Sequence, residues 1–187
     1  MTKHILVLVG SLRAGSHNRQ LAEAAAHHAP QNVEVAVYQG LADLPYYNED
    51  LDVGAVVPAV ETLRTAVADA DALLLVSPEY NGTMSAVLKN AIDWLSRPFG
   101  AGAITDKPVA VVGAAFGAYG GVWAHDDVRK AVGIAGGVVV QDVTLSVPHS
   151  RKRFADLHPA DDSEVAEKLS GILAVLAGAR STISTTN

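Results

Sequence analysis

Short apolar runs recur along the chain, and longer segments of mixed polarity separate them. The first run, 5–9, contains only Ile, Leu and Val. Runs of this kind are typical of strands buried on both faces of a parallel sheet. The segment 138–147 is longer, and we expect it to be extended or broken near Asp142. The pattern predicts strands at 5–9, 33–38, 72–76, 108–113 and 138–147.

The segments between these runs show helical periodicity. Apolar residues recur at helical spacing in 18–29, after Pro58, in 84–97, in 121–132 and around 165–176. Pro58 suits the first turn of its helix, and we expect Asp162 or Ser163 to cap the last one. The polar connection 39–54 has sixteen residues, which is longer than a connector requires, so a functional role is expected there.

The alternation of strands and helices predicts an α/β fold. Each crossover helix returns the chain to the same edge, so the sheet should be parallel. Five such units without a repeat predict one domain spanning 1–187, with the strand order 2-1-3-4-5 of flavodoxin-like three-layer sandwiches. Ligands bind beyond the carboxyl ends of the strands in such sheets. The loops after strands one, three and four are therefore the candidate site.

Composition narrows the classes of function. The chain carries 14 basic and 20 acidic residues, a net charge of −6, which weighs against nucleic acid or an anionic membrane as partner. It contains no cysteine, so disulfides, thiolate metal ligands and cysteine nucleophiles are excluded. The histidines lack metal-ligand spacing, and no metal is expected. Without a signal-like segment or an apolar run of about 18 residues, the chain is expected to be soluble and cytoplasmic.

The loop after the first strand has the residues of a phosphate-binding cradle. It runs Gly10-Ser11-Leu12-Arg13-Ala14-Gly15-Ser16-His17-Asn18 directly into a predicted helix. A helix start offers unpaired N–H groups and the positive end of the dipole to an anion. The loop lacks both the P-loop lysine and the Gly-x-Gly-x-x-Gly fingerprint, so the anion that it suits is a terminal monophosphate. The alternative is that Ser16 only caps the helix and Arg13 is solvated. For the nonapeptide as a whole we favour phosphate binding, because hydroxyls, amides and the Arg13 guanidinium occur together. The predicted cofactor-binding residues of this loop are Ser11, Arg13, Ser16, His17 and Asn18.

The loop after the third strand reads Ser77-Pro78-Glu79-Tyr80-Asn81-Gly82-Thr83. A flavin ring needs donors and acceptors along its edge, and the amides of such a bend together with the Asn81 side chain supply both. An ordinary strand-to-helix turn explains the same residues equally well. The shared edge with the first loop favours a binding role. The predicted ring-site residues are Pro78, Glu79, Tyr80, Asn81 and Gly82.

Together these loops resemble a known family. Gly10-Ser11-Leu12-Arg13-x-x-Ser16-x-Asn18 and Pro78-Glu79-Tyr80-Asn81-Gly82, followed by Leu88-Lys89-Asn90-Ala91-Ile92-Asp93-Trp94-Leu95-Ser96-Arg97, look like the NADPH-dependent FMN reductases. The resemblance covers residue 3 to about residue 140 and includes the similar stretch 44–50. It implies a flavodoxin-like fold, FMN as cofactor, NADPH or NADH as electron donor, and flavin, quinone, chromate or azo-dye acceptors.

The resemblance also assigns roles to residues. It implies that Ser11, Arg13, Ser16 and Asn18 hold the FMN phosphate, and that 78–81 contact the ribityl chain and the ring. It suggests that the helix 84–97 contacts another subunit. A homodimer or homotetramer is therefore expected, with the Tyr46-Tyr47 loop covering a neighbour's flavin.

The loop after the fourth strand is rich in small residues, Gly113-Ala114-Ala115-Phe116-Gly117-Ala118-Tyr119-Gly120-Gly121. We expect free amides here to face the flavin edge and to stabilise the negative charge that develops on reduction. Family members often carry hydroxyl residues where this chain has alanines, so backbone contacts are expected in place of side-chain ones. A flexible linker is the alternative. The predicted residues are Ala114, Ala115 and Gly117.

Four other side chains admit ordinary interpretations. Trp123 and His125 could border the substrate pocket, but packing or exposure is the default for single residues of these types near a helix start. Asp93 and Arg97 lie four apart and are expected to form a surface ion pair.

The sequence thus predicts an FMN-dependent NAD(P)H oxidoreductase with a ping-pong mechanism and small-molecule acceptors. No catalytic side chain is expected, because the cofactor carries the chemistry. The acceptors considered are quinones, flavins, azo or nitro compounds and metal oxyanions. The alternatives are a flavodoxin-like electron carrier and an FMN-dependent redox sensor, both without NAD(P)H activity.

Overall fold

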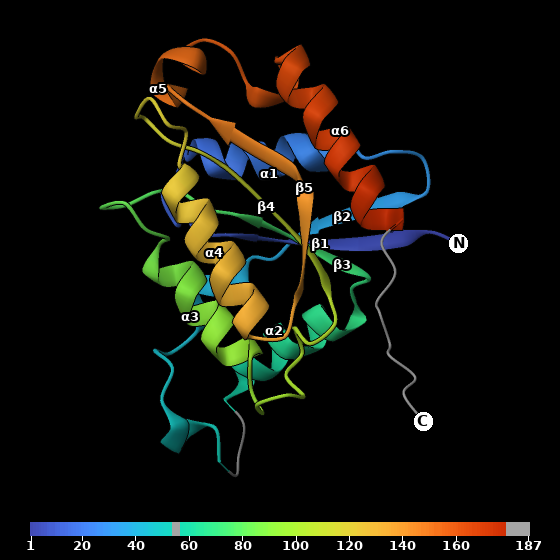
Figure 1. Cartoon of the computed structure of the whole chain (residues 1–187), viewed down its shortest axis with the longest axis vertical. Helices are drawn as coiled ribbons and strands as arrows, with labels where there is room; N and C mark the ends of the chain where they lie inside the picture. Colours follow the sequence, from blue (N-terminus) through green and yellow to red (C-terminus); the bar gives the residue numbers. More distant parts are fainter. Residues whose placement is uncertain (54–56, 179–187) are drawn as a thin grey trace.

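The computed structural model describes residues 1–53 and 57–178 and contains one parallel sheet in the order β2-β1-β3-β4-β5 (Figure 1). This confirms the predicted α/β class, strand order and flavodoxin-like arrangement. The strand bounds are β1 Lys3–Val9, β2 Val33–Val37, β3 Ala72–Val76, β4 Pro108–Ala114 and β5 Val138–Val147.

Helices cover both faces of the sheet. Their bounds are α1 His17–His27, α2 Pro58–Asp69, α3 Ala86–Leu95, α4 Val122–Ile134, α5 Ser150–Arg153 and α6 Ser163–Gly178. Along β1, Ile5 and Val7 pack with α1 and α6, whereas Leu6 and Leu8 pack with α2, α3 and α4. The side chains of residues 5–9 therefore pack against helices on both faces of the sheet, which explains the unbroken apolar run at these positions. Figure 1 shows α1 and α6 together on one side of the sheet and α2 and α3 on the other.

Two boundary predictions are resolved by hydrogen bonds. The Leu88 N–H donates to Ser85 Oγ at 3.3 Å, so Ser85 caps α3 and the helix begins later than the periodicity suggested. The Val165 N–H donates to Asp162 Oδ1 at 3.2 Å, which identifies Asp162 as the cap of α6.

The pairing of β4 with β5 is irregular. Val109 pairs with Val139 and Val111 with Thr144, so β5 contains extra residues between these two pairs. The strand stays continuous from Val138 to Val147, so of the two expectations for this segment it is extended, with the irregularity in the part that contains Asp142. Periodicity did not reveal the short elements, which are α5 and three 3₁₀ turns at Gly40–Asp43, Glu49–Leu51 and Pro159–Asp161. No helix in the described ranges has both the length and the apolarity required to cross a membrane.

Candidate functional site

A cavity of about 400 Å³ opens at the carboxyl edge of the sheet, where the loops after β1, β3, β4 and β5 meet. We call it the rim cavity. Its volume lies within the usual range for small-molecule sites. Of the residues predicted from sequence, only Asn81 and Gly82 are not among its lining. The lining residues are Ser11, Arg13, Ser16, His17, Asn18, Pro78, Glu79, Tyr80, Ala114, Ala115, Phe116, Gly117 and Ser150.

The first two loops approach each other closely because residue 10 is glycine. A Cβ at Gly10 would lie 2.6 Å from Ser85 Oγ and 3.0 Å from Pro78 Cδ. The first of these distances is shorter than real Cβ contacts, and the second is tight. A side chain at position 10 would therefore displace either the Ser85 cap or the two loops. The convergence on which the predicted site depends is thus built into the chain by this glycine.

The β1–α1 loop forms one end of the cavity, which we call the phosphate end. Ser16 is the N-cap of α1 by position, yet its side chain makes no capping hydrogen bond. Ser11 and Ser16 are 5% and 2% exposed and both line the cavity. The N–H groups of the first turn of α1 lack helical partners. Hydroxyls, amides and the Arg13 guanidinium therefore converge on one small volume, as an anion site requires.

Asn18 has a structural role that sequence reasoning missed. Its side-chain amide donates to the Ala114 carbonyl at 2.9 Å, and its Oδ1 accepts from the Ala114 N–H at 2.8 Å. This reciprocal pair is buried and joins the start of α1 to the end of β4. One amide hydrogen of Asn18 stays uncommitted for a ligand. The residue therefore fixes the phosphate end against the central sheet.

His17 closes the phosphate end with its imidazole ring. Burial lowers the pKa of His17, and the nearby Arg13 guanidinium lowers it further. Its Nδ1 lies 3.2 Å from the Ser150 Oγ, and its ring packs edge-on against Phe116 and Phe154. Ser150 was not predicted as a site residue, because it reaches the cavity only through the tertiary course of β5 into α5.

The β3–α3 loop forms the opposite end of the cavity, which we call the ring end. The Tyr80 N–H donates to the Thr83 carbonyl and the Thr83 N–H to the Tyr80 carbonyl, each at 3.1 Å. Asn81 and Gly82 between them have φ values of 53° and 76°. These are the conformations of a type I′ turn, for which Asn-Gly is the preferred sequence. Both residues lie at an exposed tip, so local geometry accounts for them without a ligand.

Glu79 links the ring end to α4. Its Oε2 accepts a hydrogen bond from the Ala124 N–H at 3.3 Å, in the first turn of that helix. A carboxylate in this place caps the helix and interacts favourably with its dipole. Glu79 therefore lines the cavity as predicted and also positions α4 beneath it.

The β4–α4 loop corrects one expectation. The Ala114 N–H donates to Asn18, and the Ala115 N–H donates to the Val147 carbonyl at 3.1 Å. The prediction that these two amides are free to face a ring is therefore wrong, because neighbouring strands and α1 already use them. Phe116, which is 59% exposed, is the large side chain of this loop that enters the cavity lining.

Beneath this loop, His125 is a packing residue, in agreement with the default expectation. Its Nε2 donates to the Ser77 carbonyl at 3.2 Å, so the Nδ1 of the neutral ring accepts from Ser146 Oγ at 2.8 Å. Burial lowers the pKa of His125 to about 4, although the bond to Ser77 acts in the opposite direction. A Cβ at Gly113 would lie 2.5 Å from His125 Nε2 and 2.1 Å from the Ser77 oxygen.

Trp123 is half exposed and packs on Tyr119.

The stretch around Tyr47 binds to α3 and not to the rim cavity. The Pro45 carbonyl accepts from Asn90 Nδ2 at 3.0 Å and from Trp94 Nε1 at 2.9 Å. Arg97 donates to the Tyr47 hydroxyl at 3.1 Å. The predicted Asp93–Arg97 ion pair is therefore wrong. The partner of Asp93 is Lys89, at 2.6 Å.

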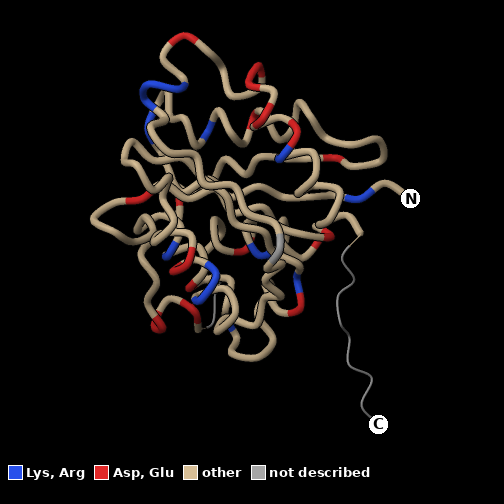
Figure 2. Tube along the Cα trace, turned by 45° about the horizontal axis from the view of Figure 1, so that its top comes forward, with Lys and Arg blue, Asp and Glu red and all other residues tan. Residues whose placement is uncertain are grey.

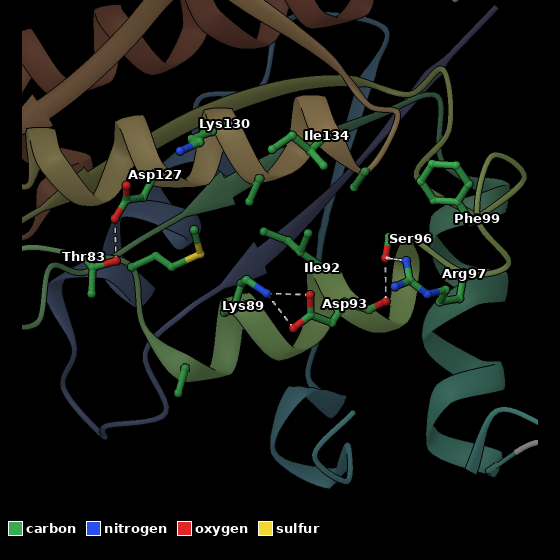
Figure 3. A pocket seen from close by; sticks show the side chains of 14 residues that line it. Thr83, Lys89, Ile92, Asp93, Ser96, Arg97, Phe99, Asp127, Lys130 and Ile134 are labelled. Carbon is green, nitrogen blue, oxygen red and sulfur yellow. Dashed lines mark hydrogen bonds and ion pairs between the residues drawn. The ribbon is translucent and has the colours of Figure 1, made fainter. Parts of the chain in front are cut away.

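A second cavity, of about 770 Å³, lies between α3 and α4 (Figure 3). We call it the α3–α4 groove. Figure 3 shows that its charged groups are largely satisfied within the chain, since Lys89 pairs with Asp93 and Thr83 with Asp127. Its remaining walls are mostly apolar. The rim cavity is smaller, but it is lined by the Ser11 and Ser16 hydroxyls and by Arg13. Across the described ranges, no three His, Cys, Asp or Glu side chains are grouped to bind a metal ion.

Comparisons with known proteins agree with this geometry. The family model for NADPH-dependent FMN reductases matches residues 4–152. A 2-hydroxy-1,4-benzoquinone reductase from a Burkholderia species is 38% identical over 155 residues, which cover 82% of this chain and 83% of the relative. An NAD(P)H-dependent FMN reductase from Pseudomonas aeruginosa is 39% identical over 161 residues, covering 86% and 75%.

A solved structure gives the same result. The flavoenzyme NAD(P)H:(acceptor) oxidoreductase of Paracoccus denitrificans superposes with a TM-score of 0.83 at 30% identity, covering 95% of this chain and 96% of that one. Sequence and structure thus identify an oxidoreductase that uses FMN, with NADPH or NADH as electron donor. The chain belongs to the NADPH-dependent FMN reductase family.

Proposed function

We propose that the rim cavity binds FMN and that the protein passes electron pairs from NADPH or NADH to small acceptors by a ping-pong mechanism. The phosphate end carries this proposal. There the nearly buried Ser11 and Ser16 surround the start of α1, with Arg13 beside them. Such donors suit the terminal phosphate of FMN, and the same cavity is lined by Pro78 and Tyr80 at the ring end.

The protein's own groups bind and orient. Bound FMN would supply the two-electron chemistry between donor and acceptor. Pro78 and the Tyr80–Thr83 turn shape one wall of the ring end, and the segment 114–117 shapes the other. Donor and acceptor would enter in turn through the same exposed opening beside Tyr80 and Phe116, which is the physical basis of the ping-pong order.

Rapid mixing tests the proposal. FMN-loaded protein mixed with NADPH under argon should lose its yellow absorbance within seconds. Steady-state rates at several donor and acceptor concentrations should then give parallel double-reciprocal lines. A flavin that stays oxidised for many seconds contradicts the reductase proposal, and intersecting lines contradict the ping-pong order.

Among acceptors, we propose quinones first. The Burkholderia relative is named for a benzoquinone, and the ring end offers a flat compound the exposed aromatic faces of Tyr80 and Phe116. Flavins, azo and nitro compounds and metal oxyanions remain in the test set. Rates with 1,4-benzoquinone should exceed those with chromate at equal concentration.

An electron carrier is the second candidate. It is favoured by the exposed aromatic side chains on the β4–α4 side of the site, which are Phe116, Tyr119 and Trp123. Stepwise chemical reduction separates the two functions. Two distinct one-electron steps together with no reaction toward NADPH would favour the carrier.

We also propose a homodimer or homotetramer in which a second copy covers the α3–α4 groove. Phe99 and Ile134 are 84% and 71% exposed at this groove, and its mixed charges, Lys130 and Asp127 among them, suit a self-complementary contact. The Ile134→Glu variant should lower the mass measured by light scattering. Leu157→Glu, at another partly exposed apolar position, should not.

A further inference from the structure

A small basic depression lies next to the rim cavity. It has a volume of about 340 Å³ and is lined by Phe116, His149, Arg151 and Lys152. We call it the basic pocket. Phe116 lines both the basic pocket and the rim cavity, so the two are neighbours across one aromatic ring.

Hydrogen bonds fix the basic pocket relative to the rim. The His149 N–H donates to the Gly117 carbonyl at 3.1 Å, and the Ser150 N–H donates to the Ala115 carbonyl at 3.0 Å. Figure 1 shows α5 beside the loop that leads from β4 to α4. His149 has a φ of 49°, in the left-handed region, and this turn starts α5. The pocket is therefore a fixed extension of the site.

The charges of α5 are used in two different ways. Arg153 is committed, because it pairs with Asp162 at 2.7 Å and with Glu164 at 2.9 Å. Arg151 and Lys152 are exposed, and neither forms an ion pair with any residue in the described part of the chain. In a chain of net charge −6, α5 contains three consecutive cations, and it forms a blue run at one corner of the trace (Figure 2).

This combination suits a phosphate monoester attached to an aromatic nucleoside. A guanidinium contacts two phosphate oxygens at once, an ammonium adds a second positive charge, and the exposed Phe116 ring offers a face for a base. NADPH differs from NADH by a single terminal phosphate on the adenosine ribose. In other dinucleotide-binding proteins an arginine beside this ribose accommodates its 2′-phosphate.

We propose that Arg151 and Lys152 bind the 2′-phosphate of NADPH and so make this enzyme prefer NADPH to NADH. The inference rests on the proposed function, because the nicotinamide must reach the rim cavity while the adenosine phosphate lies across Phe116. The phosphate of FMN is placed elsewhere, at the start of α1, so the two anion sites do not compete.

Kinetics with both donors test the proposal in the FMN-loaded protein. In the double variant Arg151→Gln/Lys152→Gln, KM for NADPH should rise about 10- to 100-fold, as expected for the loss of charge-assisted hydrogen bonds. KM for NADH should stay within about twofold. The matched control Arg19→Gln/Lys168→Gln removes the same charge from positions outside both cavities and should change neither value.

Calorimetry provides a second readout that needs no turnover. The FMN-loaded wild type should bind 2′,5′-ADP more tightly than 5′-ADP, and the double variant should lose this difference. Three results would each overturn the proposal. They are an equal rise in KM for NADPH and NADH in the double variant, equal binding of 2′,5′-ADP to wild type and variant, and a loss of activity confined to anionic acceptors. If neither nucleotide reduces the flavin of the wild type, the proposed function fails, while calorimetry still decides the phosphate site.

Discussion

The two ends of the rim cavity differ in burial and in the use of their polar groups. At the phosphate end, Ser11, Ser16 and Asn18 are each at most 5% exposed, and Asn18 is bonded in both directions to β4. At the ring end, Tyr80 is 51% exposed and belongs to a turn held by its own backbone. One end is fixed to the sheet and the other faces solvent.

This difference matches the chemistry required of each end. A cofactor that stays bound through many turnovers needs a buried anchor whose donors are held in place before binding. Donor and acceptor must instead exchange at the reacting ring, so that end has to stay open. The contrast predicts that affinity for FMN depends on the phosphate end, whereas turnover depends on the ring end.

The largest effect is expected from Gly113→Ala, which disturbs the support beneath the ring end. The new Cβ would lie 2.1 Å from the backbone oxygen of Ser77, so the strand ends must separate. We expect a loss of about 3 kcal/mol or more in the free energy of unfolding, measured by urea denaturation. Gly117→Ala in the same loop meets nothing within 4 Å and should cost far less. Equal costs would contradict this account of the support.

His125 should make the same region sensitive to acid. Its pKa is about 4 in the folded protein against 6.5 as the ordinary value, so between these pH values the unfolded chain binds the additional proton. The stabilisation from the neutral ring is complete above pH 6.5 and decreases as the pH falls toward 4, by about 3 kcal/mol in total. Urea titrations between pH 4 and 7 should show this slope in the wild type and a shallower one in His125→Gln. Parallel slopes would show that His125 does not cause it.

The phosphate end is tested with Arg13→Ala. Removing a cation that faces the anion should weaken FMN binding about 10- to 100-fold and leave riboflavin binding unchanged. Fluorescence titration measures both ligands. Arg19→Ala is the matched control, because Arg19 donates to Gln39 and does not line the cavity. A similar loss in both variants would indicate a general charge effect in place of a specific contact.

The smallest effect is expected at the exposed tip of the ring end. Asn81 has a φ of 53°, which alanine tolerates less well, so Asn81→Ala should reduce the free energy of unfolding by about 1 kcal/mol. The dissociation constant for FMN should not change, because Asn81 is not part of the cavity lining. A tenfold weaker affinity for FMN would show that Asn81 contacts the cofactor, and the two ends would then differ less than this account requires.

The sequence was sufficient for the sheet and for most of the cavity lining, because both follow from local patterns. Buried strands have unbroken apolar runs, and polar loops at their carboxyl ends must share one edge. The errors and omissions arise from contacts between distant segments. The bonds between Asn18 and Ala114, the approach of Ser150 to His17 and the contact of Arg97 with Tyr47 depend on tertiary packing.

One pattern had two adequate explanations. Asn81-Gly82 suits a ligand loop and a type I′ turn equally well in sequence, and only the φ values show which geometry the backbone adopts. Conversely, the basic run of α5 lies outside the loops and the helix whose motifs indicated the family in the sequence. Only the fold shows that it stands next to the rim cavity.

The central claim is that the phosphate end anchors the cofactor, and paired fluorescence titrations of the wild-type protein with FMN and with riboflavin test it most directly. We expect FMN fluorescence to be quenched on binding, with riboflavin binding at least about 100-fold more weakly, since the anchor acts on the phosphate alone. Equal affinities for the two compounds, or FMN fluorescence that does not change, would contradict the account.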